Sequence, residues 1–276
     1  MTTDAFYTAP DGATIAYELG GHGRTIGYAH GVLLSRAAVR GLDLVDIDAI
    51  AAHRQLLTYD QRGHGHSSGR AVIDDFSFEQ AADDLLGILG AAAVEEPVDF
   101  AGSSWGAAAV LYAALSAPHR FRRLALLIPP ASWGTRAQEG RRWYDETADR
   151  IERIGPAAWR DEWANAAPLP VFADHPGATF VPDVADHVLA AVLRGVGRSE
   201  LPDPTAIAGL RHPTLILTWP SDPLHAVTTA AHLHVLIPNS SLVVARSVAD
   251  IQAWTHVIAD FFNSRDDDLA AAGIRA

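Results

Sequence analysis

The sequence predicts an α/β fold in which helices flank one mostly parallel, eight-stranded sheet. Short apolar runs alternate along nearly the whole chain with longer segments of helical periodicity. Strands separated by helices pair in parallel, because each helix carries the chain back across a face of the sheet. The chain has 276 residues and is 49% hydrophobic, so it is long and apolar enough to bury a large core.

Eight apolar runs are expected to be strands. The first two flank Pro10-Asp11-Gly12, a turn sequence that predicts a hairpin and therefore an antiparallel edge. The sixth run stops at Pro129-Pro130, since a residue before proline is restricted in its backbone angles. The strands are expected at residues 5–8, 14–19, 25–29, 55–59, 98–101, 124–128, 214–219 and 242–245.

Capping residues indicate where several helices begin. Ser77 precedes an apolar stripe that has acidic and amide residues in its first turn, which is typical of a helix start. Ser247 with Asp250 three residues later marks the start of the last helix. Helices of the core are expected around residues 39–52, 78–90, 107–116 and 251–262.

A long insertion separates the sixth and seventh expected strands. Such connections usually take about two to six residues, whereas this one runs over residues 131–212. We therefore predict a core domain of residues 1–130 and 213–276, with 131–212 as a helical lid after the sixth strand. Its helices are expected at 136–154, 157–165 and 184–193. Most of its aromatic residues should pack onto the sheet, while Trp133 and Trp143 are candidates to line an apolar substrate pocket.

The stretch Gly102-Ser103-Ser104-Trp105-Gly106 follows an apolar run and precedes an alanine-rich segment. It matches the pattern G-x-S-x-G, in which a serine sits on a sharp strand-to-helix turn. The flanking glycines allow the strand and the helix to pass closely. The pattern predicts Ser104 as a nucleophile, with the start of the next helix facing the oxyanion that forms when a serine attacks a carbonyl.

Two further motifs accompany this turn. His30-Gly31 ends one apolar run, and Arg62-Gly63-His64-Gly65 follows another. Together with Ser104, these motifs resemble the α/β-hydrolase family in their order and approximate spacing. The resemblance extends from about Ala13 to Phe262 and implies that family's fold.

The resemblance also implies the remaining parts of the site. It assigns the oxyanion-binding amides to Val32 and Trp105, with Leu33 as the alternative to Val32. The histidine of His30-Gly31 usually shapes its loop in this family. We expect His30, Leu33 and Trp219 to contribute to substrate binding.

The candidate acid and base match the family pattern less closely than the serine turn does. Asp222 follows the seventh strand, where α/β-hydrolases commonly carry their acid. The histidine that the family carries after the last strand is absent from residues 246–248. His256 falls opposite the apolar stripe of the last helix and should face solvent. His225 remains as the candidate base, and the alternative that it is a loop residue without a catalytic role stays open.

Composition excludes several other chemistries. The chain has no cysteine, which excludes thiolate nucleophiles and thiolate metal sites. Its 21 basic residues are all arginine, so lysine Schiff bases and a standard P-loop are excluded as well. No metal or cofactor is expected, because His64 and His66 lack an evident third ligand. The net charge of −12 argues against nucleic acid as a partner.

The expected partner is a small-molecule substrate, and no association with a membrane is expected. Whether the protein forms a homodimer stays open. No apolar stretch approaches the length of a membrane span, and no basic leader precedes an apolar segment, so a cytoplasmic location is expected. Two functions remain open. One is a serine hydrolase that cleaves an ester, lactone or related acyl bond of a small, largely apolar substrate. The other is a non-hydrolytic family member, either a cofactor-free lyase, cyclase or oxygenase or a small-ligand binding protein.

Overall fold

The computed structural model describes residues 4–175 and 179–265. In these segments one eight-stranded sheet has the order β1-β2-β4-β3-β5-β6-β7-β8. The strands lie where the sequence predicts them, to within a few residues. Their bounds are Ala5–Thr8 (β1), Thr14–Gly20 (β2), Thr25–Ala29 (β3), Gln55–Tyr59 (β4), Val98–Ser103 (β5), Phe121–Leu127 (β6), Thr214–Thr218 (β7) and Ser240–Val244 (β8).

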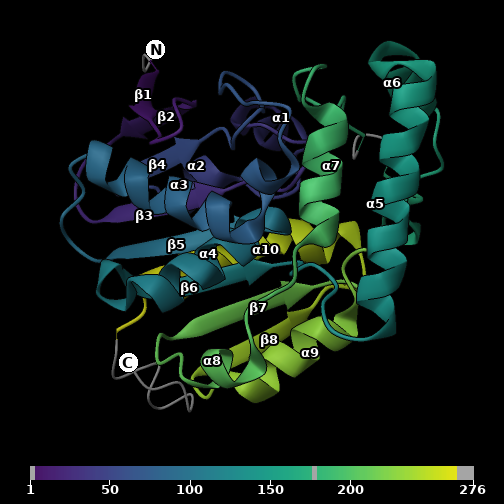
Figure 1. The fold of residues 1–276 in the computed structure, drawn as a ribbon. Helices are drawn as coiled ribbons and strands as arrows, with labels where there is room; N and C mark the ends of the chain where they lie inside the picture. The colour runs from purple at the N-terminus through teal and green to yellow at the C-terminus, as the bar shows by residue number, and fades with distance from the viewer. Residues whose placement is uncertain (1–3, 176–178, 266–276) are drawn as a thin grey trace.

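The pairing confirms a mostly parallel sheet with one antiparallel edge (Figure 1). β1 and β2 form the predicted hairpin, and β2 also pairs antiparallel with β4. All pairs from β4 to β8 are parallel. Consequently β3, β5 and β7 end at the same edge of the sheet, which is where ligands bind in open α/β folds.

Helices cover both faces of the sheet. One face carries α3 (Phe78–Ala91), α4 (Trp105–Ser116) and α9 (Val227–Leu236), and the other carries α2 (Ile47–Ile50) and α10 (Val248–Asn263) (Figure 1). The predicted caps form: Ser77 accepts the Gln80 amide at the start of α3, and Ser247 with Asp250 makes a capping box on α10. Each cap satisfies backbone donors that the first helical turn leaves without partners.

The helix expected at residues 39–52 is instead two short helices, α1 (Arg36–Gly41) and α2. Ser35 caps the first, and the Asp46 side chain accepts the Ala49 amide to cap the second. Between them Asp43 has a φ of 52°, a left-handed conformation that a continuous helix does not allow. Local capping therefore divides a segment that apolar spacing alone predicts as one helix.

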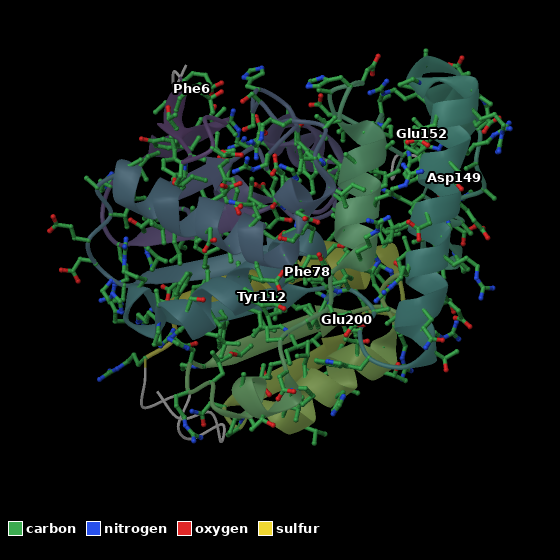
Figure 2. All side chains as sticks on the ribbon, in the orientation of Figure 1. Phe6, Phe78, Tyr112, Asp149, Glu152 and Glu200 are labelled. Carbon is green, nitrogen blue, oxygen red and sulfur yellow. The ribbon has the colours of Figure 1, made fainter. Side chains whose placement is uncertain are left out.

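The segment between β6 and β7 is helical, with α5 (Thr135–Ile154), α6 (Pro156–Ala164), α7 (Leu189–Arg198) and α8 (Pro204–Ala208). α5, α6 and α7 stand beside the edge of the sheet, and α8 packs on α9 (Figure 1). Arg194 on α7 forms ion pairs with Asp149 and Glu152, at 2.5 and 2.7 Å. Both acidic residues lie on α5 (Figure 2). These pairs and the apolar contacts beneath them hold the two helices together.

α7 begins five residues later than the helix expected at 184–193. The reason is that residues before it pair with loops of the core. Val184 forms an isolated antiparallel bridge with His64, and the Asp183 amide donates to the Leu33 carbonyl. In the described segments no helix combines the length and the apolar character that crossing a bilayer requires.

Candidate active site

Ser104 occupies a strained turn between β5 and α4. Its φ is 52° and its ψ is −115°, a combination that a serine adopts only where the surroundings impose it. The turn requires both glycines, because a Cβ on Gly102 would overlap the Gly106 carbonyl and one on Gly106 would overlap the Ala29 carbonyl. The crossing of strand and helix therefore presents the Ser104 hydroxyl at the carboxyl edge of the sheet.

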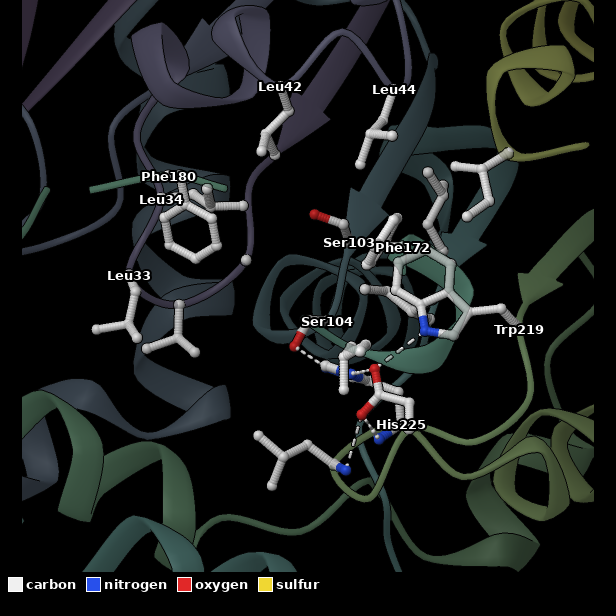
Figure 3. A pocket seen from close by; sticks show the side chains of 18 of the residues that line it. Leu33, Leu34, Leu42, Leu44, Ser103, Ser104, Phe172, Phe180, Trp219 and His225 are labelled. Carbon is white, nitrogen blue, oxygen red and sulfur yellow. Dashed lines mark hydrogen bonds and ion pairs between the residues drawn. The ribbon is translucent and has the colours of Figure 1, made fainter. Parts of the chain in front are cut away.

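The Ser104 hydroxyl meets the loop that follows β7. Ser104 Oγ lies 2.7 Å from His225 Nε2, and His225 Nδ1 lies 2.8 Å from Asp222 Oδ2 (Figure 3). The hydroxyl, imidazole and carboxylate are thus arranged in the order that a serine, histidine and carboxylate relay for acyl transfer has. The histidine comes from the same loop as the acid, rather than from the segment after the last strand.

The loop folds around the Asp222 carboxylate, which explains how a spacing of three residues suffices. Asp222 Oδ1 accepts the amides of Leu224 and His225 at 2.9 and 3.2 Å. This hydrogen-bonded turn is typical of aspartate, and it bends the chain so that the imidazole returns to the other carboxylate oxygen. Trp219 Nε1 donates to that same oxygen, Oδ2, at 3.0 Å.

Asp222 is charged in this setting. Burial favours the neutral acid, but the positive charge that His225 can carry, and the hydrogen bonds from His225, Leu224 and Trp219, outweigh it and lower the Asp222 pKa to about 2. An ionised carboxylate accepts the Nδ1 hydrogen of the ring, so Nε2 is left to accept the proton of Ser104. The charge of Asp222 thus selects the tautomer that a general base needs.

The loop after β3 lies directly against Ser104. A Cβ placed on Gly31 would be 3.3 Å from the Ser104 Cβ, so the chain passes close to Ser104. The Val32 amide has no acceptor among the described residues, whereas the Leu33 amide donates to His64 Nε2 at 3.1 Å. The alternative donor, Leu33, is therefore already engaged. Trp105 is the first residue of α4, where a helical amide has no acceptor one turn back.

His30 and His64 lie behind this loop, and both are buried. His30 Nε2 accepts the Gln61 amide at 2.8 Å, and His64 Nδ1 donates to the Arg62 carbonyl at 2.9 Å. Burial, together with the neighbouring His30, lowers the His64 pKa to about 3, so the ring is neutral and accepts the Leu33 amide. Both rings support the loop. The substrate contact expected of His30 is not found, since His30 does not line the cavity described next.

A cavity of about 440 Å³ opens over Ser104 (Figure 3). Of the predicted substrate contacts, Leu33, Trp143 and Trp219 line it. Trp133 does not line the cavity, because its ring packs on His232 with the centroids 5.1 Å apart. The walls are mainly aliphatic and aromatic, and they include Val39, Leu42, Leu44, Tyr144, Trp163, Phe172, Phe180 and Trp254.

The cavity carries little charge. Among the described residues that line it, Asp222 is the one acidic side chain, and no arginine contributes. Two arginines of α5 pair with acidic residues on exposed surface instead: Arg136 with Glu139 and Arg141 with Glu200. Within the described segments no cluster of three or more histidine, aspartate or glutamate side chains is placed to hold a metal ion. The site therefore suits a neutral, apolar ligand.

Sequence reasoning missed two polar residues of the wall. Tyr28 and Ser103 both line the cavity, and the Tyr28 hydroxyl lies 3.2 Å from Ser103 Oγ. Tyr28 sits in the apolar run before His30-Gly31, so periodicity indicates a core strand and nothing more. Its position beside the nucleophile turn follows from the pairing of β3 with β5.

Comparisons with known proteins agree with this fold. A family model described as alpha/beta hydrolase fold matches residues 29–153. The putative carbamate hydrolase RutD of Agrobacterium fabrum is 31% identical over 157 residues, which are 51% of this chain and 58% of that protein. The non-heme chloroperoxidase CPO-A1 of Kitasatospora aureofaciens is 33% identical over 125 residues, 45% of this chain and 44% of that protein. The matches thus span about half the length of these relatives.

A solved structure of a hydrolase from Pseudomonas aeruginosa is similar over the whole fold. Its TM-score is 0.75 at 22% identity, and the alignment covers 95% of this chain and 99% of the other. Eight strands in the observed order, the serine turn after β5 and the match over residues 29–153 define the fold. This chain has the α/β-hydrolase fold.

Proposed function

We propose that the protein is a serine hydrolase that cleaves an ester, lactone or related acyl bond of a small, largely apolar substrate. The observation that carries this proposal is the distance of 2.7 Å between Ser104 Oγ and His225 Nε2, with Asp222 on the far side of the ring. The relative named as a putative carbamate hydrolase supports acyl chemistry of this kind.

The reaction proceeds in two halves. Ser104 Oγ attacks the carbonyl carbon while His225 Nε2 takes its proton, and the amides of Val32 and Trp105 hold the oxyanion. The tetrahedral intermediate collapses when His225 gives this proton to the leaving group, which leaves an acyl-enzyme. A water molecule then attacks, His225 takes the proton of the water and returns it to Ser104 Oγ, and the acid is released.

The cavity defines the substrate class. Leucine, valine, tryptophan and phenylalanine side chains form most of its surface, and the described part of the wall offers no cation to bind a carboxylate or phosphate. Medium-sized or aromatic acyl groups without charge should therefore bind best. Trp143 and Trp163 belong to residues 131–212, which we interpret as a lid over Ser104.

The non-hydrolytic alternative depends on the lack of a base after the last strand. The contact of His225 with Ser104 weighs against this alternative, because an imidazole at hydrogen-bonding distance can serve as the base. A binding protein would not need an ionised carboxylate behind the ring. For this reason the hydrolase is the function that we favour.

A fluorophosphonate probe tests the nucleophile, because it forms a covalent bond with an activated serine. We expect one label on Ser104, loss of labelling in Ser104→Ala, and full labelling in Ser116→Ala, whose side chain lies exposed at the end of α4. Mass spectrometry of the labelled peptide locates the adduct. A label on Ser103, or one that survives in Ser104→Ala, would refute the assignment, and an unlabelled native protein would favour the non-hydrolytic class.

A further inference from the structure

The cavity wall contains one pair of hydroxyl groups that the relay does not use. Tyr28 belongs to β3 and Ser103 is the last residue of β5, and Tyr28 Oη lies 3.2 Å from Ser103 Oγ. Both side chains are buried, at 6% and 8% exposure, and both line the cavity. Most of the surrounding wall is apolar, so this pair is one of its few polar features.

Counting hydrogens shows that the pair has a donor to spare. Two hydroxyl groups carry two hydrogens, and the single hydrogen bond between them uses one. Neither oxygen has another partner among the described residues. Burial raises the pKa of Tyr28, so its phenol keeps its hydrogen at neutral pH. One O–H group is therefore available to a molecule in the cavity.

The pair lies on a different side of the nucleophile from the relay. Figure 3 shows the Ser104 hydroxyl directed at His225, while the Ser103 hydroxyl points away from it, toward the side of Leu42 and Leu44. Tyr28 belongs to the apolar cluster of Val39 and Ile251, whereas Leu33 belongs to the other cluster. A substrate that reaches Ser104 can thus extend past the hydroxyl pair into an apolar recess.

We propose that Tyr28 and Ser103 form a specificity subsite that donates a hydrogen bond to a neutral carbonyl or ether oxygen of the substrate, a few bonds away from the acyl carbon that Ser104 attacks. This inference rests on the proposed hydrolase function, which it extends from apolar esters to esters or lactones with a second oxygen. A charged group is disfavoured, because the described wall offers no cation to neutralise it.

The Tyr28 hydroxyl donates to Ser103 Oγ and so directs the remaining Ser103 hydrogen into the cavity. A neutral hydrogen bond of this kind changes an equilibrium constant about 3- to 10-fold. A substrate without the second oxygen leaves the donor without a partner, and this loss produces the discrimination. The residue pair would select among substrates without taking part in bond breaking.

The test uses a series of alkyl hexanoate esters. In each ester, one methylene group of the acyl chain or of the alkoxy chain is replaced by oxygen. Binding is measured by the change in tryptophan fluorescence in the Ser104→Ala background, where Trp143 and Trp219 report on the cavity and no turnover occurs. We expect one oxygen position at which the additional variants Ser103→Ala and Tyr28→Phe weaken binding about 3- to 10-fold. Neither variant should bind the all-carbon ester more weakly than the background does, because that ester leaves the donor without a partner. Ser116→Ala serves as the control.

Two results would overturn the subsite. One is equal weakening for every ester, including the all-carbon one, because the pair would then only pack. The other is a double variant, Tyr28→Phe with Ser103→Ala, that shows the same pattern of affinities along the oxygen scan as the background. Failure of the hydrolase proposal is seen separately, as the absence of turnover and of fluorophosphonate labelling in the native protein while the binding pattern persists.

Discussion

Trp219 and His225 donate hydrogen bonds to the same oxygen of Asp222. Trp219 Nε1 lies 3.0 Å and His225 Nδ1 lies 2.8 Å from Asp222 Oδ2. The indole stacks on Trp254, with the ring planes inclined by 12°, and so is held in place. Trp219 therefore positions the Asp222 carboxylate besides lining the cavity.

Trp219→Phe keeps an aromatic ring in the wall and removes this hydrogen bond. We expect kcat to fall about 10-fold, because a hydrogen bond to a charged group contributes about 1.5 kcal/mol or more. KM should change much less. Steady-state kinetics measures both, with Trp133→Phe, outside the cavity, as the control. A higher KM at constant kcat would mean that the indole contacts only substrate.

His225→Ala should lower kcat/KM by the same large factor as Ser104→Ala, on the order of 10⁴ or more, because members of a relay act as a unit. The double variant should be no worse than either single one. His256→Ala is the matched control, since His256 is exposed on α10. If His225→Ala retains nearly native turnover, another histidine is the base.

The acid limb of the activity profile should report one proton. Asp222 has a pKa of about 2, so it stays ionised at every pH at which activity is measured. With the carboxylate ionised throughout, only protonation of the general base itself should limit activity at low pH. The measurement is the slope of log kcat/KM against pH, with an expected limit of one. A slope of two would show that the carboxylate also titrates.

Stability should fall as the pH is lowered, and His64 should account for part of the loss. The pKa of His64 is about 3 in the folded chain, below the unfolded value of about 6.5. Between these two pH values the unfolded chain binds a proton at His64 that the folded chain does not bind. The penalty is absent above pH 6.5 and grows by about 1.4 kcal/mol per pH unit down to pH 3.

Denaturant unfolding of His64→Gln between pH 7 and pH 4 checks this. The variant should show a shallower pH dependence of the unfolding free energy, whereas the exposed His256→Gln should match the native protein. Parallel curves for native protein and His64→Gln would contradict the neutral, buried state of this ring.

Replacing a glycine of the serine turn by alanine should affect stability very differently from replacing a glycine on an open helix face. Gly106→Ala places a methyl group on the Ala29 carbonyl and should cost about 3 kcal/mol or more, or prevent folding. Gly90→Ala on α3 meets no atom within 4 Å and should stabilise by about 0.5–1 kcal/mol. Thermal unfolding compares the two, and equal effects would refute the close crossing at Ser104.

The strands and the serine turn follow from local rules, so the sequence predicts them. The spacing and the length of the apolar runs identify buried strands, and the glycines around Ser104 predict a close crossing of strand and helix. Helix bounds are less predictable where side-chain caps compete with apolar spacing. For that reason residues 39–52 form two helices, and α7 starts late, after Val184 has paired with His64.

The sequence by itself determined the fold and the serine turn, and it gave a short list of candidates for the acid and the base. It left open whether His225 reaches Ser104, since this depends on how the loop bends around the Asp222 carboxylate. Tertiary structure also decided that the Leu33 amide is engaged by His64, and that Tyr28 meets Ser103 across two strands. These features depend on hydrogen bonds between segments that are distant in sequence. A linear pattern of residue types does not specify the geometry of such bonds.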